Sequence, residues 1–206
     1  MSCLLSPRLR AVARLIERIK VKITRRVMPT LAAACLVLCN TSIAESYEEK
    51  VQASLSAIGQ PIAAIDFISL DGQPRAFNAL VGKPSVVYFF ASWCAPCYKT
   101  LHDIEQIRQQ QKVSVTLVAI ALDEDSTAVA EMIKQTGFTG ETWLANSGAK
   151  PLKKRLFANA YKVLPYVVQL DSDLVLVDHS YDIKSLSQWQ AVLVNGEQLS
   201  QASVGK

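Results

Sequence analysis

The sequence has none of the compositional extremes that mark fibrous, disordered or disulfide-dense chains. Its 206 residues include only 8 glycines, 8 prolines and 5 cysteines, while 50% of the residues are hydrophobic. This composition excludes a collagen-like repeat, an intrinsically disordered chain and a scaffold held by many disulfides. No internal repeat or low-complexity tract is visible in the sequence either. The length suits one domain of about 150 residues with an additional segment.

Net positive charge is confined to the first 44 residues. Those residues hold eight of the 22 lysines and arginines and a single glutamate, which gives them a net charge of +7. Subtracting this from the formal +4 of the whole chain leaves −3 for residues 45–206. The remaining charges are interspersed and form no long basic run. We therefore expect no nucleic-acid partner, because its electrostatic footprint is missing.

Residues 1–44 have the three parts of a secretory signal peptide. A basic region ends at Arg26, an uncharged apolar run spans residues 27–43, and a small-x-small site ends at Ala44. The apolar run is shorter than the roughly 20 residues that cross a bilayer. We expect cleavage after Ala44 and export to the periplasm or a comparable compartment. The alternative is an uncleaved leader that anchors the protein to the membrane, facing the periplasm.

Few cysteines remain once this leader is removed. Cys3, Cys35 and Cys39 lie within it, which leaves only Cys94 and Cys97. In an oxidising compartment, a pair separated by two residues closes a very small loop and adds little structural restraint. The pair therefore suits thiol-disulfide exchange better than a structural role.

The sequence offers little support for a metal or haem at this pair. A zinc site needs two further, closely spaced ligands, but the chain has only His102 and His179, which lie far apart. Attachment of a c-type haem needs a histidine directly after the second cysteine, and Tyr98 is there instead. We expect no metal and no bound cofactor.

The cysteines follow a segment with the pattern of a buried strand. Ser85–Phe90 is a continuous apolar run, which is typical of a central strand covered on both faces. Helical spacing follows over Tyr98–Gln111. Cys94 is therefore expected near a helix N-terminus, and Pro96 in the first turn, where its missing N–H costs little.

The segments that follow predict an α/β domain. Val113–Leu122 reads as a second buried strand, and Ser126–Thr136 as a helix that is capped by Asp125 or Ser126 and ends at Gly137. This strand–helix–strand–helix order implies a right-handed crossover and a parallel core within a mixed central sheet flanked by helices.

The C-terminal half adds a predicted hairpin and two predicted helices. Lys150–Tyr161 is expected to be helical, Tyr166–Leu170 and Leu174–Ser180 are expected to pair as a hairpin, and Ser185–Val194 suits a closing helix. We expect one domain over residues 59–206, preceded by an N-terminal extension at residues 45–58.

Together these segments resemble a protein of the thioredoxin fold, and within that fold the exported TlpA/ResA-like branch of thiol-disulfide oxidoreductases. The resemblance spans roughly residues 59–194 and rests on four segments, Phe67–Gly72, Gly82–Pro84, Trp93–Cys97 and Leu164–Asp171. A lone Cys-x-x-Cys is weak evidence. Its place after an apolar strand, preceded by Trp93 and followed some seventy residues later by an x-Pro-strand-Asp segment, makes the signal specific.

The resemblance implies a set of site residues. Pro165 is expected to form a cis peptide bond and to face the dithiol, and the backbone of Leu164 is expected to pair with an extended substrate chain. An ordinary strand-opening proline is the alternative for Pro165. Trp93 is expected to form the substrate-binding site with Leu164 and Pro165, and its side chain either packs in the core or shields the reactive thiol.

The position of Cys94 suggests how the two thiols divide the reaction. A free thiol titrates near pH ~8.5, whereas one at a helix N-terminus within Cys-x-x-Cys falls to about 7 or lower. Cys94 is therefore the expected nucleophile, and Cys97, one turn further along, is the expected resolving thiol.

The chain departs from the family pattern where a carboxylate often assists proton transfer. Many thioredoxins carry a buried Asp six residues before the nucleophile, where this chain has Tyr88. The TlpA/ResA-like branch often has Glu three residues past the second cysteine and Pro two further on, where Thr100 and His102 stand here. His102 is a candidate substitute base, but it lies about 140° around the helix from Cys97, which favours a surface histidine.

The sequence favours one function and leaves a second open. Ala95-Pro96 between the cysteines resembles the reducing members, which implies reduction of disulfides in exported proteins, for example during cytochrome c maturation. The electrons would come from a membrane thiol-transfer protein. The alternative is a metallochaperone or assembly factor that uses the dithiol as a copper ligand, although the sequence offers no convincing third soft ligand.

Overall fold

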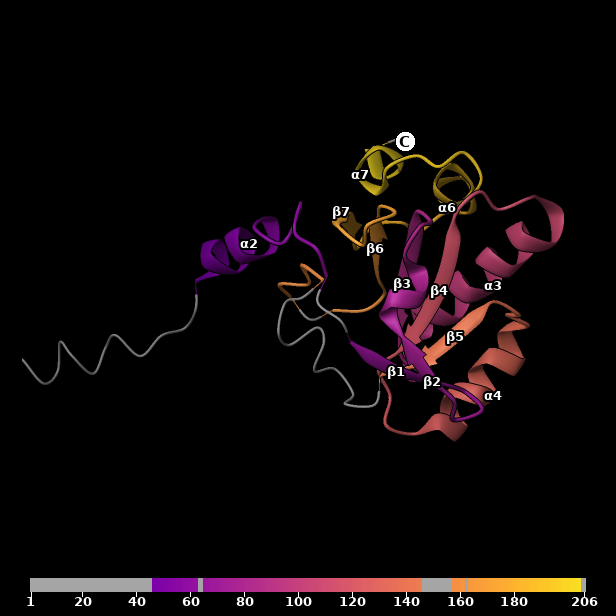
Figure 1. The fold of residues 1–206 in the computed structure, drawn as a ribbon. Helices are drawn as coiled ribbons and strands as arrows, with labels where there is room; N and C mark the ends of the chain where they lie inside the picture. Colours follow the sequence, from indigo (N-terminus) through magenta and orange to yellow (C-terminus); the bar gives the residue numbers. More distant parts are fainter. Residues whose placement is uncertain (1–45, 63–64, 146–156, 162, 205–206) are drawn as a thin grey trace, which may run out of the picture. The chain divides into compact units, whose positions relative to one another are not determined.

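A single mixed sheet organises the domain. The computed structural model describes residues 46–62, 65–145, 157–161 and 163–204. Within them, seven strands follow the order β2-β1-β5-β4-β3-β6-β7 (Figure 1). The strands are β1 Asp66–Ser69, β2 Pro74–Ala76, β3 Ser85–Phe90, β4 Thr116–Ala121, β5 Glu141–Leu144, β6 Tyr166–Leu170 and β7 Leu176–Ser180. The β3–β4 and β4–β5 pairs are parallel and the others antiparallel, which confirms the predicted α/β sheet with a parallel core.

Helices and one short 3₁₀ segment complete the described fold. They are α2 Tyr47–Leu55, η1 Phe77–Leu80, α3 Ala95–Gln110, α4 Ser126–Thr136, α6 Leu186–Leu193 and α7 Leu199–Val204. The bounds of α4 match the prediction. The Asp125 side chain accepts hydrogen bonds from the first-turn N–H groups of Thr127 and Ala128, and Gly137 ends the helix with a left-handed φ of 70°.

Strand β3 lies in the interior of the sheet, between β4 and β6, and both of its faces are apolar. All six of its residues are buried, as its continuous hydrophobic run predicts. Tyr88 and Phe90 pack into a core cluster that includes residues of α3 and α6, whereas Phe89 packs into a second cluster with Phe77 and Phe157. Each fully buried large side chain of this kind contributes about 1.5–3 kcal/mol, so β3 is a rigid base for the loop that follows it.

Several expectations need correction. The strand predicted at Val113–Leu122 is shorter, since β4 begins at Thr116 and ends at Ala121. The helix predicted over Lys150–Tyr161 lies outside the described residues as far as 156, and residues 157–161 form turns and bends rather than a helix. The short strand β5 was not predicted, nor were α2 and α7.

The predicted leader at residues 1–44 also lies outside the described residues. Among the helices that are described, none combines the length and the apolar character required to cross a bilayer.

Candidate active site

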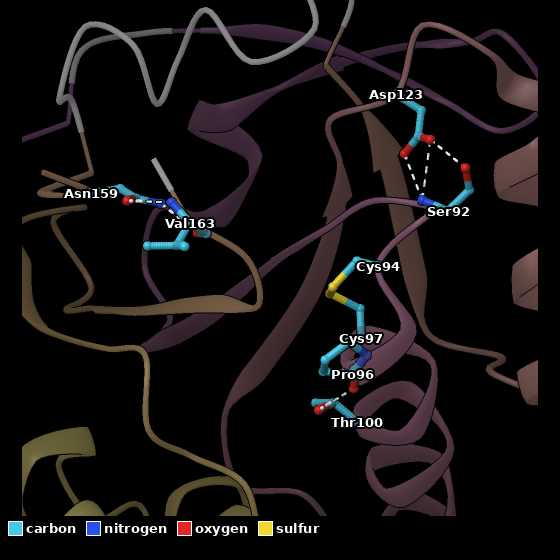
Figure 2. Close-up of a disulfide and its surroundings, with 8 residues drawn as sticks. All are labelled: Ser92, Cys94, Pro96, Cys97, Thr100, Asp123, Asn159 and Val163. Carbon is cyan, nitrogen blue, oxygen red and sulfur yellow. Dashed lines mark hydrogen bonds between the residues drawn. A yellow bond between two sulfur atoms is a disulfide. The ribbon is translucent and has the colours of Figure 1, made fainter. Parts of the chain in front are cut away.

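The two cysteines lie where the chain passes from the interior strand β3 to helix α3. β3 ends at Phe90, and Cys94 occupies the N-cap position of α3 with an extended backbone, φ −88° and ψ 93°. Pro96 is in the first turn, as predicted, because a proline there gives up only an N–H that would be unpaired. The sulfur atoms of Cys94 and Cys97 are joined in a disulfide, with their Cα atoms 5.2 Å apart (Figure 2).

The two sulfur-bearing residues differ in access. Cys94 retains 5% of its surface exposed, whereas Cys97 is fully buried at 0% within the helix-side core cluster. An incoming group therefore meets Cys94 first. Cys97 lies one helical turn behind it, with its N–H donating to the Cys94 carbonyl oxygen at 2.9 Å.

The electrostatics of the α3 N-terminus favour a negative sulfur at Cys94. The helix is 16 residues long and carries no acidic residue in its first turn. Its macrodipole places partial positive charge at the N-cap. This environment stabilises a thiolate once the disulfide is reduced, which is the requirement for nucleophilic exchange.

Leu164 and Pro165 lie at the same end of the strands as the loop that carries the two cysteines. The Leu164–Pro165 peptide bond is cis, as the resemblance implies. β6 begins at the next residue, Tyr166, which pairs antiparallel with Phe89 near the end of β3. Leu164 is half-buried and packs against both core clusters, including the one that contains the two cysteines.

A buried asparagine shapes the segment before this proline. Asn159 is fully buried, and its side chain both donates to the Val163 carbonyl oxygen at 3.0 Å and accepts from the Val163 N–H at 3.3 Å (Figure 2). The Tyr181 hydroxyl also donates to Asn159 Oδ1 at 3.0 Å. No local sequence pattern marks Asn159, because its role depends on the closure of a loop.

Trp93 does not pack in the core. Its side chain is 76% exposed, the highest value among the exposed large hydrophobic residues. The core-packing interpretation is therefore wrong, and Trp93 is available to a partner or to the thiol beside it.

Tyr88 and Thr100 stand at the two positions where the family carboxylates are absent. Tyr88 is 1% exposed, and its hydroxyl has no hydrogen-bond partner among the described residues. Burial raises the pKa of this hydroxyl, and the neighbouring Thr100 hydroxyl offsets the rise only in part. Thr100 itself donates to the Pro96 carbonyl oxygen at 3.2 Å. His102 directs its ring nitrogen Nδ1 to the Thr136 carbonyl oxygen of α4, 3.4 Å away.

Because the Tyr88 hydroxyl is buried without a partner, we expect Tyr88→Phe to raise the free energy of unfolding by about 1 kcal/mol. The matched variant Tyr166→Phe removes a buried hydroxyl that donates to the Phe157 carbonyl oxygen, so it should lower stability by about 1 kcal/mol. Urea unfolding of the oxidised proteins measures both. A loss of stability in Tyr88→Phe would show that the hydroxyl is hydrogen-bonded in the folded protein, by Thr100 or by an internal water.

Within the described residues, no group of three or more histidine, cysteine, aspartate or glutamate side chains is arranged to hold a metal ion. The site as described consists of the two cysteines and the groups that surround them.

Comparison with known proteins places this arrangement in a family. Residues 82–193 match a family model described as thioredoxin-like. Among curated proteins, none matches the chain.

Solved structures share the fold. A thiol:disulfide interchange protein of the thioredoxin family from Chlorobium tepidum is 23% identical, with a TM-score of 0.54 over 70% of this chain and 97% of that chain. The thioredoxin domain of a thiol-disulfide oxidoreductase from Bacteroides vulgatus is 19% identical, with a TM-score of 0.51 over 60% of this chain and 87% of that chain. A provisionally named protein disulfide isomerase from Bacteroides thetaiotaomicron is 25% identical, with a TM-score of 0.51 over 60% of this chain and 77% of that chain.

The family match covers more than half of the chain, and the matched segment contains the joined cysteine pair. This chain therefore belongs to the thioredoxin-like family and is a thiol-disulfide oxidoreductase.

Proposed function

We propose that this protein is an exported reductase of the TlpA/ResA-like branch that reduces disulfides in other exported proteins, such as those of cytochrome c maturation. The observation that carries the proposal is the unequal pair at the α3 N-terminus, with Cys94 at the N-cap and Cys97 fully buried one turn behind. The leader sequence supports export, and Ala95-Pro96 between the cysteines supports the reducing direction.

The reaction uses the two thiols in sequence. The Cys94 thiolate attacks one sulfur of the partner's disulfide, which forms a mixed disulfide and releases the other partner sulfur as a thiolate. Cys97 then loses its proton and attacks the Cys94 sulfur, which releases the second partner sulfur. The partner gains two electrons, and the protein is left with the Cys94–Cys97 disulfide. A second dithiol, supplied by a membrane thiol-transfer protein, returns the pair to its reduced form.

The partner is expected to bind to the surface around Cys94, where β3 ends and β6 begins. Leu164 and the cis Pro165 are half-buried at the start of β6, and Trp93 is exposed beside the nucleophile. These features support an extended protein segment that pairs with the Leu164 backbone while its disulfide approaches Cys94.

Replacing Cys97 by alanine tests the mechanism directly. Because the resolving thiol is gone, the mixed disulfide should persist, and the Cys97→Ala protein should accumulate adducts linked through Cys94. Non-reducing gel electrophoresis and peptide mapping detect them, and Cys94→Ala is the matched control without adducts. An absence of Cys94-linked adducts would contradict the assignment.

Equilibration with glutathione redox buffers gives the reduction potential, which separates a reductase from an oxidase. A reduction potential of the protein well below the redox poise of an oxidising compartment supports a reductase. The endoplasmic reticulum, for example, is poised at about −180 to −210 mV. A copper titration of the reduced protein, run beside it, tests the metallochaperone alternative.

A further inference from the structure

A carboxylate outside the Cys-x-x-Cys motif holds the loop that carries it. Asp123 follows β4, and its Oδ2 and Oδ1 accept the Ser92 N–H at 2.9 Å and 3.1 Å (Figure 2). Its Oδ1 also accepts the Ser92 hydroxyl. One side chain thus binds both hydrogen-bond donors of a residue that lies two positions before Cys94.

The contact between Ser92 and Asp123 lies just past the last paired residues of β3 and β4. β3 and β4 are parallel, their register runs to the Phe90–Ala121 pair, and the Leu122 N–H donates to the Phe90 carbonyl oxygen at 3.0 Å. Every second N–H along a strand points to the same neighbour, so Ser92 turns its N–H toward the β4 side, as Phe90 does. The Asp123 carboxylate accepts that N–H in place of a backbone carbonyl.

Ser92, the residue that Asp123 holds, lies within the turn that positions Cys94. The Cys94 N–H donates to the Ala91 carbonyl oxygen at 3.0 Å, which closes a four-residue turn with Ser92 and Trp93 at its centre. Trp93 is largely exposed, so the contact between Ser92 and Asp123 is the side-chain anchor of this turn.

We propose that Asp123 is a positioning residue that holds the Ala91–Cys94 turn so that Cys94 stays at the N-cap of α3 after the disulfide is reduced. The inference rests on the proposed role of Cys94 as nucleophile. In the oxidised protein the covalent bond to Cys97 already restrains Cys94. In the dithiol form that restraint is absent, and the Ser92–Asp123 hydrogen bonds remain to keep the sulfur at the positive end of the helix dipole.

The experiment compares three variants of the full chain. Asp123→Ala removes the clamp and the charge. Asp123→Asn removes the charge, but its amide oxygen still accepts the Ser92 N–H and its NH₂ can donate to the Ser92 hydroxyl oxygen. Asp125→Ala is the matched control, because Asp125 lies in the same loop as Asp123 but its carboxylate caps α4 and does not bond Ser92.

Each protein is reduced, the reductant is removed, and the rate of iodoacetamide alkylation at Cys94 is followed by peptide mapping from pH 5 to 9. We expect Asp123→Ala to lower the rate at pH 7 about threefold and to shift the profile to higher pH, which corresponds to the loss of a modest helix-terminus interaction. Asp123→Asn and Asp125→Ala should keep the profile of the parent.

Other outcomes overturn the inference in distinguishable ways. A lower melting temperature in Asp123→Ala with an unchanged alkylation profile would mean that the clamp only stabilises the fold. Faster alkylation in both Asp123 variants would mean that the carboxylate acts by charge repulsion and not by positioning. If the parent itself shows no preferential alkylation of Cys94, the proposed nucleophile is wrong, and this inference falls with it.

Discussion

Replacing Cys94 by serine is expected to reduce catalysed disulfide exchange to the background rate. The alcohol does not ionise at neutral pH, so the helix N-terminus has no thiolate to stabilise and no mixed disulfide can form. The substitution is nearly isosteric at a residue that retains 5% of its surface exposed, so the fold should tolerate it. Turnover of a disulfide-bonded protein substrate, with a small dithiol as electron donor, measures the loss.

Cys97→Ser is the matched control for this experiment. Both variants lose the Cys94–Cys97 bond, so they share any change in stability that follows from its absence. Only Cys97→Ser keeps the more accessible sulfur, and it should complete the first attack with formation of an adduct. Turnover in Cys94→Ser together with no adduct in Cys97→Ser would reverse the roles of the two thiols.

The elements next to the dithiol were predictable because their signals are local. Ser85–Phe90 needed only a continuous apolar run, and the bounds of α4 followed from Asp125 before it and Gly137 after it. Cys94 and Cys97 could be placed at a strand-to-helix turn for the same reason. Each of these features is encoded within a few residues, with no need for a distant partner.

The unpredicted features depend on contacts between distant segments. β5 has only four residues, and its place between β1 and β4 is fixed by pairing with both neighbours. The bond between Ser92 and Asp123 joins residues 31 positions apart. A signal for it does exist, since Asp123 lies two residues past the end of β4, the strand that is parallel to β3, but its use requires the register of the sheet.

The exposure of Trp93 illustrates a further limit. A tryptophan beside an apolar strand is compatible with core packing by composition alone, because most of its surface is hydrophobic. The turn at Ala91–Cys94 directs it outward, and that turn is defined by a backbone hydrogen bond and by the Asp123 side chain. Sequence periodicity does not carry this information.

A second large effect is expected at Glu105, a buried carboxylate that ties the dithiol helix to the segment before β5. Glu105 Oε2 accepts from Arg108 Nη1 at 2.6 Å and from the Thr139 N–H at 3.0 Å. Its Oε1 accepts from the Thr139 hydroxyl at 2.8 Å. Glu105→Gln replaces one acceptor oxygen by a donor that faces other donors. We expect it to lower the free energy of unfolding at pH 7 by about 1.5–3 kcal/mol.

The pH dependence of that difference identifies the carboxylate as its cause. Burial alone would raise the pKa of Glu105, but the hydrogen bonds from Thr139 and the charge of Arg108 outweigh it and hold the pKa below its ordinary value. The unfolded chain therefore binds the proton more readily, and the stabilisation is complete above the ordinary glutamate pKa of about 4.3. It is lost as the pH falls below that value and through the lower pKa of the folded state.

Urea unfolding of the oxidised parent and of Glu105→Gln between pH 7 and pH 3 tests this expectation. The stability difference should hold steady from pH 7 to about 5 and shrink below about 4.3, where Glu105 takes up its proton in the unfolded chain before it does so in the folded parent. Asp182→Asn is the matched control, because Asp182 pairs with Lys184 while both side chains are about 70% exposed, and exposed pairs add little stability. It should leave the unfolding curves unchanged at every pH. A difference between the parent and Glu105→Gln that stays constant down to pH 3 would assign the loss to altered packing around residue 105, since a loss of packing does not depend on the protonation of the carboxylate.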